Sequence, residues 1–346
     1  VRTTKNGANA SKPHITYSFT KSFDWISDHH PLQSTWGQGT GGKYNKNTNF
    51  SWGDKISERS GAADEVDNNG AYFVGCITGK TYYAITKKNS QETYIDSNFD
   101  AVFRTGGYTK HDVSLSGGGE KGSYYLSYAG QFQDGIVRSA YYNKHNIRLN
   151  SSYRLAPWLK ASAKTAYIYT TTNRVASNGD TSNGVYLGLL RTPADFDNTD
   201  YIGTYVDKQG ISYTDRQRMY RNEIGANANP TYNNPLWAVY EQSNTQKTDR
   251  FILTPQLDVN PLEWLNVTLR GGLDYYTTLT DEFYPINSQG ATNSQGYYSS
   301  GTSTHKELTF DAIIHATHAF SKQLKLSGTL GYSINDRQSS SNSGSV

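Results

Sequence analysis

Three aspartates close together in the sequence could supply oxygen ligands to a calcium ion. Asp195, Asp197 and Asp200 all lie within the segment DFDNTD. Ca²⁺ takes several hard oxygen ligands, and carboxylates are prominent among them. The spacing is not that of an EF-hand, since its central glycine and distal glutamate are missing. The pattern therefore favours a solvated acidic loop beside Pro193, and we predict no metal site there.

A glycine pattern and a histidine pair could also do chemistry. Gly37, Gly39 and Gly42 in GQGTGG fit the dinucleotide-binding spacing G-x-G-x-x-G. That motif needs a strand before it and a helix after it, and neither DHHPLQSTW nor KYNKNTNF predicts one. His29 and His30 have no His or Glu partner at the spacing of a catalytic metal site. The sequence predicts a glycine-rich surface loop, no cofactor and no enzyme.

Aromatic residues in the loops are better candidates for binding. They are mixed with Asn, Asp, Gln and Arg, and flat rings beside planar amides suit sugar faces or peptide backbones. The same residues suit loop-on-loop packing or contact with a partner protein equally well, so both interpretations stay open. The candidates for substrate or partner contact are Trp36, Gln38, Tyr44, Trp52, Arg191, Asp195, Asp197 and Trp237.

Composition limits the classes of protein that the chain can represent. Charge is +3 with both signs interspersed, so no basic stripe indicates nucleic acid. Cys76 is the single cysteine, which rules out an intrachain disulfide. No run of 18 apolar residues occurs, which excludes a transmembrane helix. Tyrosine occurs 28 times, and its amphipathic ring suits a membrane boundary as well as a soluble carbohydrate-binding sandwich.

Period-2 alternation of apolar and polar residues predicts nine strands. A short helix is expected around 185–190, before Pro193. The predicted strands cover residues 14–26, 107–117, 124–132, 149–155, 159–169, 250–259, 265–275, 308–316 and 324–332. Polar positions that would face a watery lumen are Arg148, Asn150, Arg154, Lys160, Lys164, Thr268, Arg270, Asp274 and Lys325.

The predicted connections are sorted by length. Those at 118–122, 156–157, 260–263 and 320–323 are short, and they alternate with longer ones at 26–106, 134–141, 173–248 and 280–304. Outer-membrane barrels have short periplasmic turns and long extracellular loops, whereas a soluble sandwich has no reason to sort its loops. Trp158 and Trp264 lie at short turns, where an aromatic girdle is expected. The fold class predicted is an antiparallel transmembrane β-barrel.

Several segments carry a family resemblance. RTTKNGANASKPHITYSF resembles the exit from the plug domain of a TonB-dependent transporter into its first barrel strand. The segments at 31–53 and 189–201 resemble extracellular loops of the SusC/RagA branch of that family, and GGGEKGSYYLSYAGQFQDGIV resembles its early barrel strands. The resemblance implies an outer-membrane nutrient importer of a Bacteroidetes-like, Gram-negative bacterium. Its partners would be a SusD-like surface lipoprotein, TonB and outer-membrane lipid, and its substrates oligosaccharides or peptides.

The chain departs from the family in completeness. Family barrels have about 22 strands, and the family's plug and TonB box have no counterpart here. We therefore expect residues 1–12 to be the tail of the plug-to-barrel junction and residues 13–346 the N-terminal part of the barrel, with further strands pairing outside them. The alternatives are a passive porin or adhesin barrel, or a soluble glycan-binding β-protein.

Overall fold

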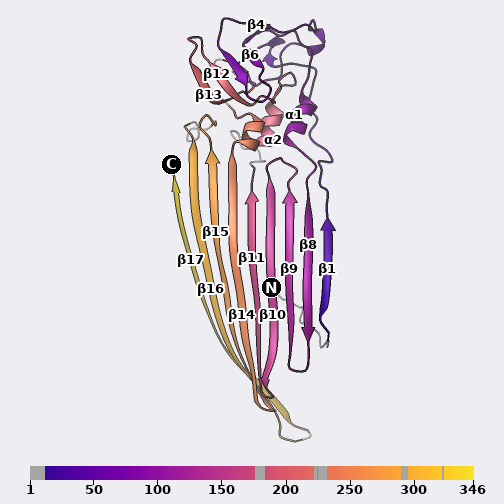
Figure 1. The fold of residues 1–346 in the computed structure, drawn as a ribbon, viewed down its shortest axis with the longest axis vertical. Coiled ribbons are helices and arrows are strands. Elements are labelled where there is room, and N and C mark those ends of the chain that lie inside the picture. The colour runs from indigo at the N-terminus through magenta and orange to yellow at the C-terminus, as the bar shows by residue number, and fades with distance from the viewer. Residues whose placement is uncertain (1–11, 176–183, 222–223, 225–231, 290–294, 322) are drawn as a thin grey trace.

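The computed structural model is dominated by one large antiparallel sheet. It describes residues 12–175, 184–221, 224, 232–289, 295–321 and 323–346. Nine strands follow one another in the order β1-β8-β9-β10-β11-β14-β15-β16-β17 (Figure 1). Every neighbouring pair is antiparallel. The expected antiparallel sheet of about nine strands is therefore confirmed.

Several of the observed strands are longer than their predicted ranges. The strands are β1 (His14–Lys21), β8 (Gly107–Gly118), β9 (Gly122–Asp134), β10 (Tyr141–Ala156), β11 (Leu159–Asn173), β14 (Ser243–Leu262), β15 (Leu265–Tyr284), β16 (Tyr297–Ala319) and β17 (Lys325–Ser345). The predictions ended where apolar alternation ended. In β16 and β17 the observed strands continue through Ser and Thr residues, which keep the same backbone ladder without an apolar face.

The sheet is open at β1 and β17. Within the described residues β1 pairs with β8 and β17 pairs with β16, so the sheet does not close on itself there. β1 is shorter than predicted, since its regular ladder ends at Lys21 rather than at residue 26. Beyond it the chain stays beside β8 through a single bridge between Asp24 and Gly106. Residues 1–11, which hold most of the predicted plug-to-barrel junction, lie outside the described residues.

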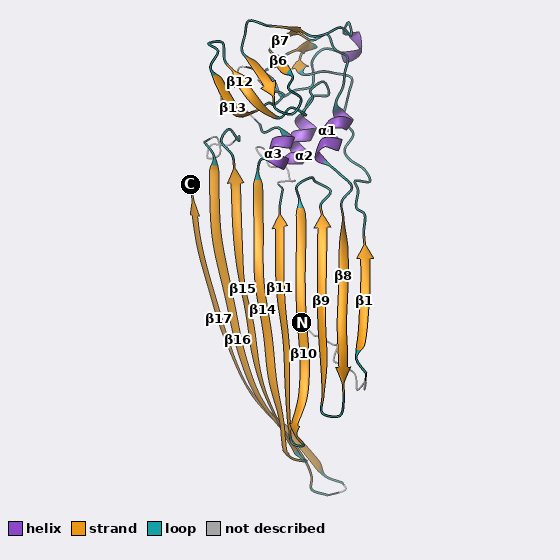
Figure 2. Ribbon diagram, viewed as in Figure 1, coloured by secondary structure: helices purple, strands orange, loops and turns teal. Residues whose placement is uncertain are grey.

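The connections separate to the two ends of the sheet, as predicted. Tight turns join β8 to β9, β10 to β11, β14 to β15 and β16 to β17 at one end. The long connections gather at the other end and pack into a compact unit (Figure 2). We define the cap as the described parts of residues 22–106 and 174–242.

The cap has secondary structure of its own. A sheet of order β13-β12-β5-β6 joins its two segments, because β5 pairs with β12. No helix of the described residues is long and apolar enough to cross a membrane. The cap elements are β2 (Gly39–Thr40), β3 (Lys43–Tyr44), a 3-10 turn (Ile56–Glu58), β4 (Glu65–Val66), β5 (Tyr72–Gly75), β6 (Thr81–Tyr83), β7 (Ile85–Lys87), α1 (Ile95–Val102), α2 (Val185–Arg191), β12 (Ile202–Val206), β13 (Ser212–Gln217) and α3 (Pro235–Tyr240).

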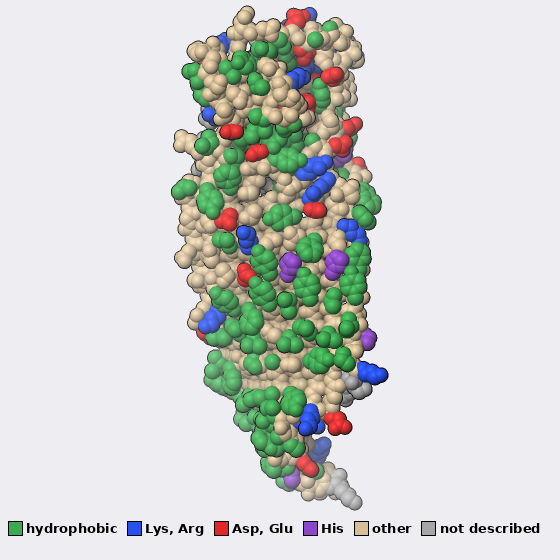
Figure 3. Space-filling view, in the orientation of Figure 1, with side chains coloured by type: hydrophobic (Ala, Val, Ile, Leu, Met, Phe, Trp, Pro, Cys, Tyr) green, Lys and Arg blue, Asp and Glu red, His purple; other side chains and the backbone are tan. Residues whose placement is uncertain are grey.

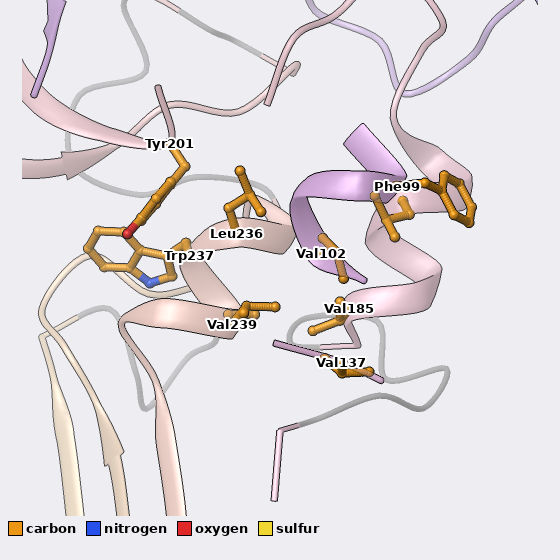
Figure 4. Packing of buried hydrophobic residues seen from close by; sticks show 10 residues of the cluster. Phe99, Val102, Val137, Val185, Tyr201, Leu236, Trp237 and Val239 are labelled. Carbon is orange, nitrogen blue, oxygen red and sulfur yellow. The ribbon is translucent and has the colours of Figure 1, made fainter. Parts of the chain in front are cut away.

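The three helices meet in an apolar core just above the sheet (Figure 4). Val102 from α1, Val185 from α2 and Trp237 from α3 are each at most 1% exposed. Val137, from the connection between β9 and β10, joins the same core. The helix predicted at 185–190 is confirmed as α2. The core joins both cap segments to the end of the sheet that carries the long connections.

Candidate functional site

The large sheet has one apolar and one polar face. Figure 3 shows the apolar face, where hydrophobic side chains spread over the strands. Leu149 is 40% exposed on this face, whereas Asn150, which points to the opposite face, is 4% exposed. The alternation predicted from sequence is therefore present, although charged residues of the polar face such as Lys160 and Lys164 are also exposed. One row on the apolar face, aligned by strand register, comprises Tyr17, Val113, Tyr128, Ile147, Tyr167, Phe251 and Tyr275.

On the apolar face, tyrosine hydroxyls bond to histidines that lie closer to the cap. The hydroxyl of Tyr17 is 2.9 Å from Nδ1 of His111, and that of Tyr128 is 2.9 Å from Nδ1 of His145. Each pair therefore repeats one arrangement, in which the ring lies on the apolar side and the polar tip points toward the cap. Rings of this kind suit a boundary between hydrocarbon and water. The short-turn end carries two exposed tryptophans, Trp158 and Trp264.

A buried ion pair joins the two cap segments. Nη2 of Arg59 lies 2.8 Å from Oδ2 of Asp195, and both side chains are 2% exposed. Nε of Arg59 also donates to Asp54 at 2.7 Å. That hydrogen bond is the main reason why the pKa of Asp54 lies below its usual value. Asp195 accepts a second hydrogen bond from the backbone N–H of Gln38 at 3.0 Å.

A second polar cluster lies beside this pair. Arg218 is 2% exposed. Its guanidinium is between the rings of Tyr82 and Phe196, 4.1 and 4.6 Å from their centroids. Asp200, also buried, accepts hydrogen bonds from the hydroxyls of Thr78 and Tyr82. Burial alone would raise the pKa of Asp200, but these bonds and the charge of Arg218 outweigh it and hold the pKa below its usual value.

Helix α3 is fixed by a cap residue and by its tryptophan. The side chain of Asn234 accepts from the backbone N–H of Leu236 at 2.9 Å, and Pro235 occupies the first helical turn. Both features are typical of helix N-termini. The indole N–H of Trp237 donates to the hydroxyl of Ser288 at 3.0 Å. Since Ser288 belongs to the connection between β15 and β16, this bond ties the cap to a third loop.

The structure divides the predicted contact residues into two groups. Gln38, Asp195 and Trp237 are at most 5% exposed, and their polar atoms are used inside the cap. The side-chain amide of Gln38 donates to the carbonyls of Lys46, Thr48 and Tyr220. Trp52 and Trp36 are 67% and 38% exposed. The first group holds the cap together, and the second is available to a ligand.

The remaining candidates are partly buried. Tyr44 lies in β3 and is half-buried. Arg191 ends α2, with its guanidinium 4.7 Å from the ring centroid of Tyr232. Asp197 accepts from the backbone N–H of Thr199 at 2.8 Å, as in a short Asx turn. All eight candidates thus lie in the cap, but they do not converge on one spot.

The patterns considered for metal and nucleotide chemistry have structural roles here. Asp195 and Asp200 belong to separate hydrogen-bonded clusters, and the described residues contain no group of His, Cys, Asp and Glu that could hold a metal ion. Gly37 lies against the guanidinium of Arg59, so a Cβ there would collide with it. Gly39 is buried and has a φ of +152°, which favours glycine. The predicted surface loop is therefore partly a packed one.

Sequence reasoning missed the residues that hold the cap together. Arg59 and Arg218 occur in segments without periodicity, so nothing marked them as buried. Helix α3 was detectable, because Asn234 followed by Pro235 is a recognised helix-start signal. Helix α1 has neither a side-chain cap nor a proline at its start, and its eight residues are too short for a clear pattern.

The hollows along the described part of the sheet include the following two. One, of about 650 Å³, lies near the short turns and is lined mostly by Gly, Ser and Ala. Its lining offers few groups that could select a ligand. The other, of about 390 Å³, lies on the polar face between β10, β11 and β14. Its lining includes Arg148, Asn150, Lys164, Gln256 and Arg270.

No protein-family model matches the sequence, and no curated protein matches it. Solved structures do match. A chain of the RagAB peptide importer in its closed-closed state is 17% identical with a TM-score of 0.65, over 99% of this chain and 36% of that chain. The RagAB peptide importer in its open-open state is 17% identical with a TM-score of 0.63, over 99% of this chain and 36% of that chain. A structure of the RagAB peptide transporter is 17% identical with a TM-score of 0.62, over 98% of this chain and 37% of that chain.

The described sheet resembles part of the barrel of these importer chains in fold. The chain spans a little over a third of the length of the importer chains that it matches. Identity of 17% supports the likeness of fold alone. The partial barrel nevertheless explains the arrangement seen here, since a barrel wall needs one face for its surroundings and one for its interior. Its neighbours are transporters rather than enzymes.

Proposed function

We propose that this chain is part of a TonB-dependent outer-membrane transporter of the SusC/RagA type, which imports oligosaccharides or peptides. The observation that carries the proposal is a partial barrel with an apolar outer face, a polar concave face and a cap over one end. The likeness of fold to peptide importer chains over 98–99% of this chain supports it. The peptide alternative is the one that the names of these neighbours favour.

In this proposal the apolar face contacts the lipid of the Gram-negative outer membrane. Rows of Leu, Val, Ile and aromatic side chains follow the strand register on that face. Tyrosine–histidine pairs lie on it with their hydroxyls directed toward the cap, and Trp158 and Trp264 lie at its turn end. Amphipathic aromatic residues at the borders of an apolar band are expected of a membrane-spanning barrel. The cap would then face the cell exterior.

Substrate capture is assigned to the exposed side of the cap. Trp52 and Trp36 present large aromatic surfaces near Tyr44, and Arg191 offers a cation on α2. Aromatic anchors with polar neighbours are the residues that most often dominate binding energy. A SusD-like surface lipoprotein would close over this side, and TonB would act through parts of the transporter outside these residues.

The test is an uptake assay in cells that express the full-length transporter. Trp52→Ala should lower uptake of the oligosaccharide or peptide, or the yield of co-purified lipoprotein, by at least about tenfold, the effect expected for a hot-spot residue. Trp158→Ala is the matched control, since this tryptophan is 50% exposed at the opposite end of the sheet. Equal loss in both variants would contradict the assignment of capture to the cap.

Loss of TonB distinguishes active import from the passive alternative. A TonB-dependent transporter should stop accumulating substrate in a strain without TonB, whereas a porin would continue to equilibrate it. An unchanged rate of uptake in that strain would reject the proposed energy coupling. Barrel assembly in each strain is checked by the heat-dependent mobility of the protein on gels.

A further inference from the structure

The polar face of the partial barrel is divided into two halves by charge. On β14 to β17, acidic and basic side chains pair across strands. Nε of Arg250 lies 2.8 Å from Oδ1 of Asp274, and Nη2 of Arg270 lies 2.8 Å from Oδ2 of Asp311. Glu307 is 3.2 Å from Nη2 of Arg337. Asp274, Asp311 and Glu307 are therefore each paired with an arginine of the same half.

The other half carries cations without such partners. Arg148 on β10 and Lys164 on β11 have no ion pair or side-chain hydrogen bond within the part of the chain that the structure describes. Nε of Arg148 is buried without a hydrogen-bond partner. Register places the two cations on adjacent rows, because Asn150 lies opposite Lys164 and Arg148 opposite Ala166.

Neighbouring carboxylates do not compensate these two cations. Asp112 on β8 pairs with Lys110 at 3.0 Å. Asp258 on β14 accepts from Gln256 at 2.9 Å and from Thr268 at 3.0 Å. Arg148 is half-buried, and an unpaired cation that is partly removed from water costs free energy. Lys164 is exposed and adds a second positive charge, so this half of the face favours an anion.

Both cations line the hollow of about 390 Å³ described above. A guanidinium presents a planar fork that matches a carboxylate, and an ammonium adds a second charge. The same hollow is lined by the amide of Gln256 and the hydroxyls of Ser162 and Thr254, which can donate to further oxygens. Its volume is in the range of small-ligand sites.

We propose that this hollow is a carboxylate-binding site on the concave wall, with Arg148 and Lys164 as its two cationic contacts. Its ligand is a carboxylate group, carried either by a substrate that passes along the wall or by another segment of the full-length protein that packs against it. The proposal rests on the proposed function for the concave face being a lumen. The test below measures binding and stability directly, so its failure would leave the transport proposal standing.

The first arm uses full-length transporter purified in detergent, titrated calorimetrically with succinate and with neutral succinamide as the matched probe. Succinate is expected to bind and succinamide is not. Arg148→Gln and Lys164→Gln should each weaken succinate binding at least about tenfold. Lys144→Gln is the control, because Lys144 lies on the same face of β10 but outside the hollow. Succinate binding that survives both substitutions would overturn the site.

The second arm covers a carboxylate from the protein itself, which would keep succinate out. In that case Arg148→Gln and Lys164→Gln should each lower the midpoint of thermal unfolding by several degrees relative to Lys144→Gln. Arg148→Lys should recover most of the loss, because it keeps the charge. No succinate binding together with midpoints equal to that of Lys144→Gln would overturn the proposal. A loss that Arg148→Lys does not recover would also overturn it, since packing and not charge would then be responsible.

Discussion

Arg59 and Asp195 form a buried ion pair between residues that are 136 positions apart in the sequence, with Nη2 and Oδ2 separated by 2.8 Å. The pair joins the first long connection to the connection between β11 and β14. Removing one partner of such a pair leaves the other charge buried and uncompensated, which costs about 3–5 kcal/mol. The cap is therefore one folded unit rather than two neighbouring loops.

Arg59→Met should loosen both cap segments together while the sheet stays folded. Hydrogen exchange in the full-length protein should show lost protection around residues 54–60 and 193–200. Lys55→Gln is the control, since its ion pair with Glu58 is exposed and is worth at most about 1 kcal/mol. If protection is lost only in the segment that carries the substitution, the ion pair does not join the two cap segments.

Acid should open the cap through Asp200. Its pKa lies below the usual 3.8 in the folded cap, so its interactions stabilise the folded state at neutral pH. That contribution falls as pH drops below about 4 and through the lowered pKa, because the unfolded chain then binds the proton more readily. Hydrogen exchange between about pH 5 and pH 2 should show a weaker acid response in Asp200→Asn than in the parent. If Asp200→Asn and the parent respond to acid identically, Asp200 does not cause the opening of the cap in acid.

Trp237 should dominate the stability of the helical core. It is 1% exposed, so Trp237→Ala should cost about 3–5 kcal/mol by leaving a cavity. Ser288→Ala removes the acceptor of its indole N–H and should cost about 1–3 kcal/mol. Limited proteolysis of the cap in the full-length protein measures both. A larger effect of Ser288→Ala would show that the hydrogen bond matters more than the packing.

Adjacent residues on β15 test the two faces of the sheet. Leu269 lies on the apolar face and Thr268 on the polar face, where its hydroxyl donates to Asp258. Leu269→Arg should cost about 2–4 kcal/mol if its position is at the middle of a bilayer. Thr268→Arg should be tolerated, since the new cation can pair with Asp258. Folding titrations in lipid vesicles measure the difference, and equal costs would count against a membrane-facing surface.

The sheet was predictable because its residues repeat every two positions over many strands. Leu149 and Asn150 differ in polarity, and their alternation alone placed them on opposite faces. The order of short and long connections followed from the strand positions. The extra length of β16 and β17 was not predictable, since their Ser and Thr residues fit a polar strand and a loop equally well.

The candidate site was predictable only to the level of the region. Trp52 and Trp237 are the same residue type in the same kind of segment, yet one is 67% and the other 1% exposed. Burial of a loop residue depends on contacts with distant parts of the chain, such as the one between Trp237 and Ser288. The type of a residue indicates what its side chain can bind, but it does not indicate which other parts of the chain the side chain already contacts.

The connectivity of the cap also dictates the order in which the chain folds. The bond from Gln38 to the carbonyl of Tyr220 closes 182 residues, and β8 to β11 lie between the two. Hairpins such as β10 and β11 close a short turn and form much faster than contacts of this separation. Local pairs within one cap segment, such as β5 with β6, can also form early. The contacts between the two cap segments are therefore expected to form only after the strands beneath them have paired, so the assembled cap is the last part of the chain to fold.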